Sequence, residues 1–179
     1  MTYSMHKYTI YIAMKVLILG MVFAGFVGAG FYVRNYYKVR KVFFENLLNF
    51  CDHLLIEISF QKSTIQKIIQ TYGDSYGRHF RNLIVGYQNL IETKQDITRE
   101  KIIALLGKNR LKPAEITNIA DFLYELGRHG SNEENSKIQS KRVNFDNFFE
   151  HSANALKRDA SIYLKVFILM GIAAVILLV

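Results

Sequence analysis

The chain has 179 residues, a formal net charge of +8 at neutral pH, and a hydrophobic content of 50%. Its single cysteine, Cys51, excludes an internal disulfide and a multi-cysteine metal site. Basic residues are not interleaved with aromatic residues as they are on a nucleic-acid-binding surface, so we expect no nucleic-acid partner.

The first predicted element is a transmembrane helix over residues 16–33 (VLILGMVFAGFVGAGFYV), which contains no charged side chain. A helix that crosses a bilayer needs about 17–25 mostly apolar residues, and this stretch is long enough. Residues 1–15 are read as an N-terminal extension, and Met14-Lys15 resembles a natural start, which leaves Met1 and Met14 both open as the initiator. A cleaved signal peptide is the alternative interpretation, but the uninterrupted length and the stronger basic flank after the stretch argue against it.

A long helix is predicted to continue from this span to about Tyr72, because apolar residues recur there at three- and four-residue steps. The pattern breaks near residues 61–64, where Ser63 or Thr64 is expected to cap a new helix. A turn is expected at residues 73–77.

Three further helices are predicted after this turn. The first carries the apolar residues between Phe80 and Ile91, and the second is expected to start at Asp96 and end at Gly107. The third has a clear start signal at residues 112–115 (KPAE), with a proline in the first turn and an acid near the positive helix end.

The last helix is predicted to open with a capping box at residues 131–134 (SNEE) and to continue into a second transmembrane helix over residues 162–179. Lys165 lies near the start of this span, where its ammonium can reach the headgroups. The fold class is therefore all-α: a membrane hairpin with N- and C-terminal transmembrane helices and a helical bundle over residues 34–161 between them.

Basic residues flank the middle domain at both membrane boundaries. Arg34, Lys38 and Arg40 follow the first span, and Lys157 and Arg158 precede the second. The positive-inside rule therefore places residues 34–161 in the cytoplasm, and membrane lipids account for much of the basic excess.

No catalytic, cofactor-binding or metal-binding constellation is evident in the sequence. The five histidines are scattered, and no phosphate-binding Gly-Lys-Ser/Thr sequence occurs. Asp121 and Glu125 are one helical turn apart and can share a site, but no nucleophile accompanies them. We therefore expect a protein that is not an enzyme and needs no cofactor.

A ridge of small residues in the first span predicts helix packing in the membrane. Gly20, Ala24 and Gly28 recur every four residues, which allows another helix to approach closely. The second span contains Gly171, which is expected to meet this ridge.

Several segments resemble stage III sporulation protein AB, a family related to the inner-membrane platform proteins of type II secretion. The matching segments are KVLILG at residues 15–20, GFY at 30–32, LLIEISF at 54–60, FLYELG at 122–127, and the glycine-containing terminal span ending in VILLV at 175–179. Their order covers nearly the whole chain. The chain departs from the family pattern at three places. Ser63-Thr64 stands where the family commonly has a proline, Gly130 where an acid is often seen, and Glu134-Asn135 where a glutamine is usual.

This resemblance implies a membrane platform of a secretion-like transenvelope complex in the mother-cell membrane around the forespore. The implied partners are a secretion-type ATPase resembling stage III sporulation protein AA and other membrane proteins of the sporulation channel; a homo-oligomer is also possible. We place the ATPase-docking surface on the loop between the last two helices, at Glu125, Gly127, Arg128, His129, Glu133 and Glu134. The alternative is a membrane-anchored helical tether or signalling protein unrelated to sporulation.

Overall fold

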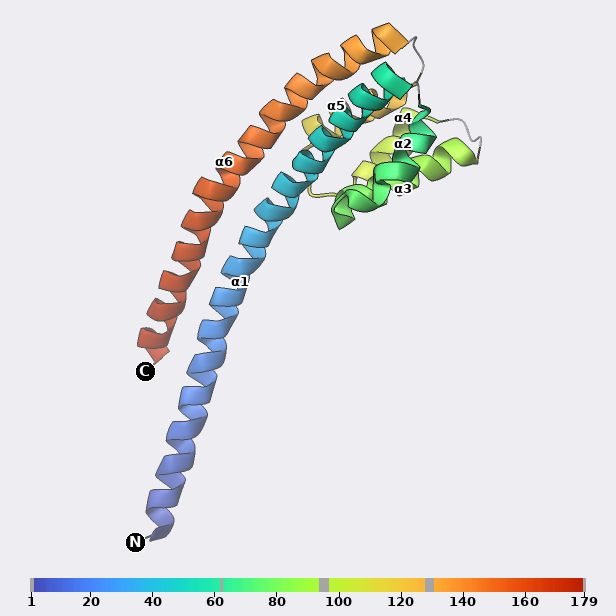
Figure 1. Cartoon of the computed structure of the whole chain (residues 1–179). Coiled ribbons are helices and arrows are strands. Elements are labelled where there is room, and N and C mark those ends of the chain that lie inside the picture. The colour runs from blue at the N-terminus through green and yellow to red at the C-terminus, as the bar shows by residue number, and fades with distance from the viewer. Residues whose placement is uncertain (1, 62, 94–96, 128–130, 179) are drawn as a thin grey trace. The chain divides into compact units, whose positions relative to one another are not determined.

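The structure is a computed structural model that describes residues 2–61, 63–93, 97–127 and 131–178, with side chains described from residue 13 onward except at 60–61 and 131–132. Every regular element in these residues is helical (Figure 1), which confirms the predicted all-α fold. The helices in chain order are α1 (Thr2–Ile56), a π-helical turn (Glu57–Gln61), α2 (Ile65–Tyr72), a 3₁₀ turn (Gly73–Ser75), α3 (Arg78–Glu92), α4 (Arg99–Leu106), α5 (Pro113–Glu125) and α6 (Ser131–Leu178).

The chain divides into two compact units, which are described separately. The terminal unit contains Met1–Tyr37 and Ala155–Val179, and the helical unit contains Lys38–Asn154. The predicted limits of the extension, the two membrane spans and the cytoplasmic domain stay predictions.

The helix starts follow the local sequence signals. Thr64 is the N-cap of α2 and its hydroxyl accepts a hydrogen bond from the Lys67 amide, as expected of a capping threonine. The Glu115 carboxylate accepts from the Lys112 amide at 2.8 Å and thereby closes the first turn of α5, which begins at Pro113.

The start of α4 differs from expectation, whereas its predicted end at Gly107 is confirmed. The N-cap of α4 is Thr98, because the helix begins at Arg99; the predicted capping residue, Asp96, lies outside the described residues. Gly107 does cap the C-terminus of α4, but its φ of −59° is helical, so this position does not require the left-handed conformation.

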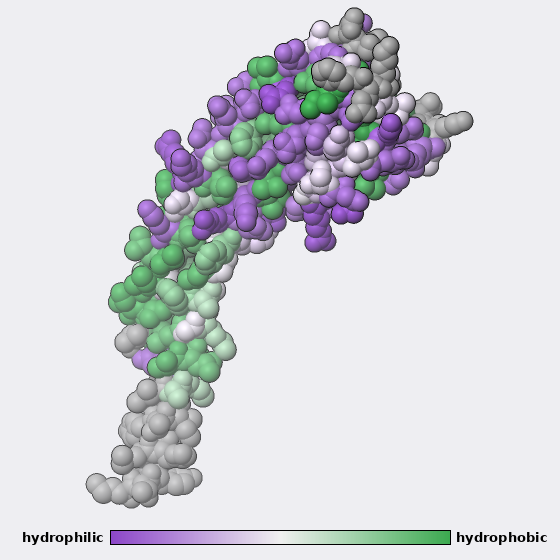
Figure 2. All heavy atoms as spheres, in the orientation of Figure 1, coloured by the Kyte–Doolittle hydropathy of each residue, from purple (hydrophilic) through white to green (hydrophobic). Residues whose placement is uncertain are grey.

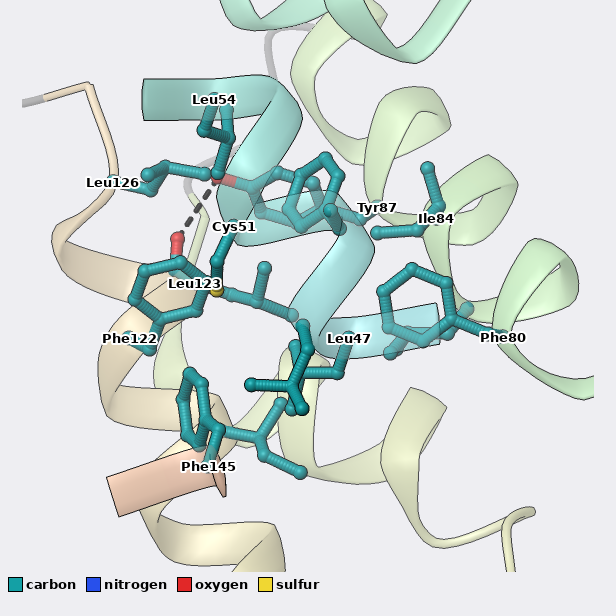
Figure 3. Packing of buried hydrophobic residues seen from close by; sticks show 14 of the residues in the cluster. Leu47, Cys51, Leu54, Phe80, Ile84, Tyr87, Phe122, Leu123, Leu126 and Phe145 are labelled. Carbon is teal, nitrogen blue, oxygen red and sulfur yellow. Dashed lines mark hydrogen bonds between the residues drawn. The ribbon is translucent and has the colours of Figure 1, made fainter. Parts of the chain in front are cut away.

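The core of the helical unit draws on the C-terminal part of α1 and on α2, α3, α4, α5 and α6. Figure 3 shows large side chains from α1, α3, α5 and α6 converging: Leu47, Leu54, Phe80, Ile84, Tyr87, Phe122, Leu123 and Phe145. The Tyr87 hydroxyl donates to the Leu123 carbonyl at 2.8 Å, so the one polar atom of this ring is satisfied inside the core. Burial raises the pKa of the Cys51 thiol to about 12, so this thiol is a packing residue.

A buried ion pair links α1 to α5 inside the helical unit. The Arg40 guanidinium contacts both carboxylate oxygens of Glu115, with Nε 3.3 Å from Oε2, and the side chains are 7% and 4% exposed. Because Glu115 also caps α5 through the Lys112 amide, one carboxylate joins the helix start to α1. Removing either partner would leave the other charge buried and unpaired.

In the terminal unit, α1 and α6 approach each other closely at two glycines. A Cβ atom built on Gly30 would lie 2.9 Å from Leu164 Cδ1, and one on Gly171 would lie 3.0 Å from Phe23 Cδ2. The Tyr37 and Tyr163 rings stack with their centroids 6.5 Å apart. Each glycine thus lets one helix accept a bulky side chain from the other.

Both long helices are apolar enough to cross a membrane, by length and composition. Within each, the most apolar window is only 6% buried, which distinguishes these segments from the core helices of a soluble domain. On the face shown in Figure 2, most side chains over the described part of the two apolar segments are hydrophobic. An exposed apolar surface of this kind is typical of helices that cross a bilayer.

Candidate functional site

The loop predicted to dock a partner connects α5 to α6 in the helical unit. Glu125 is exposed at the end of α5, and Glu133 is exposed in the first turn of α6, where it pairs with Lys137 at 3.2 Å. Arg128 and His129 lie outside the described residues. Glu134 differs from its neighbours because it is only 5% exposed.

Gly127 and Glu134 form a clamp, a hydrogen bond that joins the two described sides of the α5–α6 connection. Gly127 has a φ of +82°, a conformation that favours glycine, and its amide donates to Glu134 Oε1 at 2.9 Å. The predicted capping box at residues 131–134 depends on the Ser131 side chain, which lies outside the described residues; the described hydrogen bond of Glu134 is with Gly127, two residues after the end of α5. The other oxygen, Oε2, is buried without a hydrogen-bond partner among the described residues.

The clamp lies beside a second close approach. A Cβ atom added to Gly127 would lie 2.6 Å from Ile65 Cδ1, at the start of α2. Glycine is therefore required here for two reasons, the positive φ and the contact with α2. Gly127, at the start of the α5–α6 loop, is thereby packed against a helix more than sixty residues earlier in the sequence.

A pocket of about 500 Å³ opens at this junction. Its described wall is mostly apolar, with contributions from the π-helical turn, α2, α3 and both ends of the docking loop: Ile58, Ser63, Thr64, Ile65, Gln66, Tyr87, Ile91, Ile97, Leu126, Gly127 and Glu134. This volume lies within the range of small-ligand pockets, about 300–1,000 Å³.

The buried carboxylate of Glu57 links the π-helical turn beside the pocket to the residues that follow it. Glu57 is 6% exposed and accepts hydrogen bonds from Ser63 Oγ at 2.8 Å and from the Tyr72 hydroxyl at 2.9 Å. The hydrogen bond to Glu57 raises the pKa of the Tyr72 phenol. The Tyr72 ring stacks on the His53 ring, so this histidine has a packing role. Both carboxylate oxygens of Glu57 therefore accept a hydrogen bond, whereas only one oxygen of Glu134 does so among the described residues.

Asp121 and Glu125, the two acids one helical turn apart in α5, do not form a shared carboxylate site. Asp121 contacts Arg99 Nε at 2.6 Å, which ties α5 to α4, while Glu125 is exposed. Within the described residues no group of three or more histidine, cysteine, aspartate or glutamate side chains can hold a metal ion.

The small-residue ridge of the first span lies apart from the contact between the two spans. Cβ atoms added to Gly20 or Gly28 would meet nothing within 4 Å, and Ala24 is exposed. Gly171 packs instead on Phe23 and Phe26. The expected contact between the ridge and Gly171 is therefore not formed in the terminal unit, and Gly30 takes a packing role that the sequence reading missed.

Sequence reasoning singled out the α5–α6 loop as a docking surface, which stays a prediction, and it did not predict the pocket. The charged residues on either side of Gly127 drew attention to the loop, and a glycine directly after a helix was a signal for a left-handed residue. Nothing local distinguishes Glu134, which is buried, from Glu133, which is exposed. The pocket wall comes from four separated segments, so no spacing rule reveals it.

Comparison with known proteins identifies the family. The family model of stage III sporulation protein AB matches residues 15–179, and the chain belongs to this family. Membership assigns the chain a role in sporulation. No curated protein and no solved structure matches the chain.

Proposed function

We propose that this chain is a non-enzymatic membrane platform of a sporulation-specific, secretion-like complex. In this proposal the terminal unit spans the mother-cell membrane around the forespore, and the helical unit lies in the cytoplasm and docks a secretion-type ATPase resembling stage III sporulation protein AA. Family membership, two helices able to cross a membrane and the basic flanks of the helical unit support it.

The observation that carries the docking role is the pocket at the α5–α6 loop. A preformed, mostly apolar hollow with a buried carboxylate at its wall is a surface at which a partner side chain can be desolvated and held. Exposed charges at Glu125 and Glu133 lie at the two ends of the same loop. Such rim charges govern association rate and choice of partner more than affinity.

Reversal of charge at the loop tests this docking role. The double substitution Glu125→Lys and Arg128→Glu is expected to abolish co-purification of the ATPase with the full-length chain, because the charge of both side chains is reversed. The matched control exchanges the exposed ion pair Lys41–Glu45, as Lys41→Glu with Glu45→Lys, and is expected to retain the ATPase. Circular dichroism of both variants checks that the helices are intact.

Two outcomes contradict the docking role. Undiminished ATPase recovery with the loop variant removes the assignment of this surface. Digestion at Lys94 or Lys108 by protease added outside intact cells places the helical unit on the wrong side of the membrane for an internal motor.

The open ridge of the first span is the proposed contact for other membrane proteins of the channel or for a second copy. A cysteine at Gly20 or Gly28 is expected to form cross-linked dimers in membranes if the second copy is the partner, since nothing in the terminal unit covers these positions. Ile18→Cys is the control, because Ile18 is 53% exposed but lies about 200° around the helix from Gly20. The buried Cys51 provides an unreactive background. Equal cross-linking at all three positions would indicate collision and not an interface.

A further inference from the structure

The pocket at the α5–α6 loop contains a polar atom for which the described chain supplies no partner. Glu134 lines the pocket and is 5% exposed, and its Oε2 meets no hydrogen-bond donor among the described residues. Its Oε1 is occupied by the Gly127 amide, which fixes the direction of the carboxylate. A buried carboxylate oxygen without a donor is unfavourable, so this site is incomplete as it stands.

The rest of the described pocket wall carries no charge that neutralises the Glu134 carboxylate, because none of the described lining residues is basic. Three of them carry hydroxyls, and each hydroxyl already takes part in a hydrogen bond: Ser63 donates to Glu57, Thr64 accepts from the Lys67 amide, and Tyr87 donates to the Leu123 carbonyl. Gln66 adds a neutral amide, so the charge of the described wall is that of Glu134.

The other walls of the pocket suit an aliphatic stem. Ile58, Ile65, Ile91 and Ile97 contribute branched side chains. The Tyr87 ring is held by its hydrogen bond to the Leu123 carbonyl (Figure 3), so it forms a fixed surface. Lysine and arginine bury their methylene stems along such surfaces and place their charge at the end.

We infer that this pocket binds a basic side chain, flanked by an aliphatic residue, of a partner protein, and that Glu134 is the residue that pairs with its cationic group. The inference deepens the proposed docking role by naming the chemistry of the partner segment. Complementarity of charge carries it: one carboxylate oxygen without a described partner lies at the wall of a mostly apolar pocket whose described lining residues include no basic side chain. A charge-assisted hydrogen bond in such surroundings is among the stronger polar contacts in proteins.

Two blocked dipeptides probe the pocket without any knowledge of the partner. Acetyl-leucyl-arginine amide carries the cation, and acetyl-leucyl-citrulline amide has nearly the same shape without the charge. The full chain, in lipid nanodiscs with ¹³C-labelled isoleucine methyl groups, reports binding through the methyl shifts of Ile58, Ile65, Ile91 and Ile97. The arginine peptide is expected to bind about tenfold or more tightly than the citrulline peptide.

Two variants assign this preference to a particular residue. Glu134→Gln keeps an oxygen for the Gly127 amide and removes the charge, so it is expected to bind both peptides equally and to melt no lower than the wild type. Glu150→Gln removes the same charge from an exposed side chain farther along the same helix, and is expected to keep the full preference for arginine.

Each other result overturns the inference. Equal binding of the two peptides to the wild type, or no shift of the pocket methyl groups with either, shows that the pocket does not take a basic side chain. A preference that survives in Glu134→Gln, or is lost equally in Glu150→Gln, shows that Glu134 is not the residue that pairs with the cation. Because no ATPase is present, these results are independent of the co-purification test of the proposed function.

Discussion

Replacement of Glu115 with alanine is expected to lower the free energy of unfolding of the helical unit by about 3–5 kcal/mol, because it leaves the buried Arg40 charge without a partner. The same change removes the acceptor for the Lys112 amide at the start of α5. Thermal or urea unfolding of the full chain in detergent, followed by circular dichroism, measures the loss.

Two comparisons separate the ion pair from a general effect of charge. Glu45→Ala removes an exposed carboxylate paired with Lys41 and is expected to cost less than about 1 kcal/mol. The double variant Arg40→Met with Glu115→Met is expected to be more stable than Glu115→Ala, since no buried charge remains unpaired. A double variant that is less stable than the single one would show that the ion pair itself, and not the avoidance of an orphan charge, holds α1 to α5.

Substitution of Gly127 by leucine is expected to disrupt both the loop and the pocket. The φ of +82° would cost a residue with a side chain about 1–3 kcal/mol, and the contact with Ile65 would add an overpacking cost of about 1–3 kcal/mol. The Gly127 amide would then move away from Glu134. Unfolding measurements are expected to show the lower stability, and ATPase recovery is expected to be lost.

Gly73→Ala is the matched control for this prediction. Gly73 likewise follows a helix and lies in a turn, but its φ is −55° and an added Cβ would have its nearest neighbour at 3.9 Å. Alanine is therefore expected to be tolerated or slightly stabilising there. If Gly127→Leu proved as stable as Gly73→Ala, the loop would have room to adopt another conformation and the clamp would not constrain it.

The sequence predicted those parts of the fold that depend on neighbouring residues. Pro113 and Glu115 mark the start of α5, and Thr64 marks the start of α2, because capping acts within one helical turn. The two apolar segments at the ends were recognised from length and composition alone. The presence of several helices between them followed from apolar periodicity.

The features that the sequence did not reveal depend on residues far apart in the chain. Arg40 and Glu115 are separated by 75 positions, and each alone resembles an ordinary surface charge. The packing of Gly30 and Gly171 depends on which side of each helix faces the other, a rotation that a four-residue ridge did not determine. Burial of Glu134 likewise depends on Gly127 and on α2, which only the folded chain brings together.

The reciprocal glycine contacts of the terminal unit have a mechanical consequence. Gly30 of α1 accepts Leu164 and Phe167 of α6, and Gly171 of α6 accepts Phe23 and Phe26 of α1. Because the two helices interlock at two positions along their length, sliding one helix along its axis or rotating it would press a bulky side chain against the backbone of the other. Force applied to this pair would therefore have to tilt or shift both helices as one rigid strut.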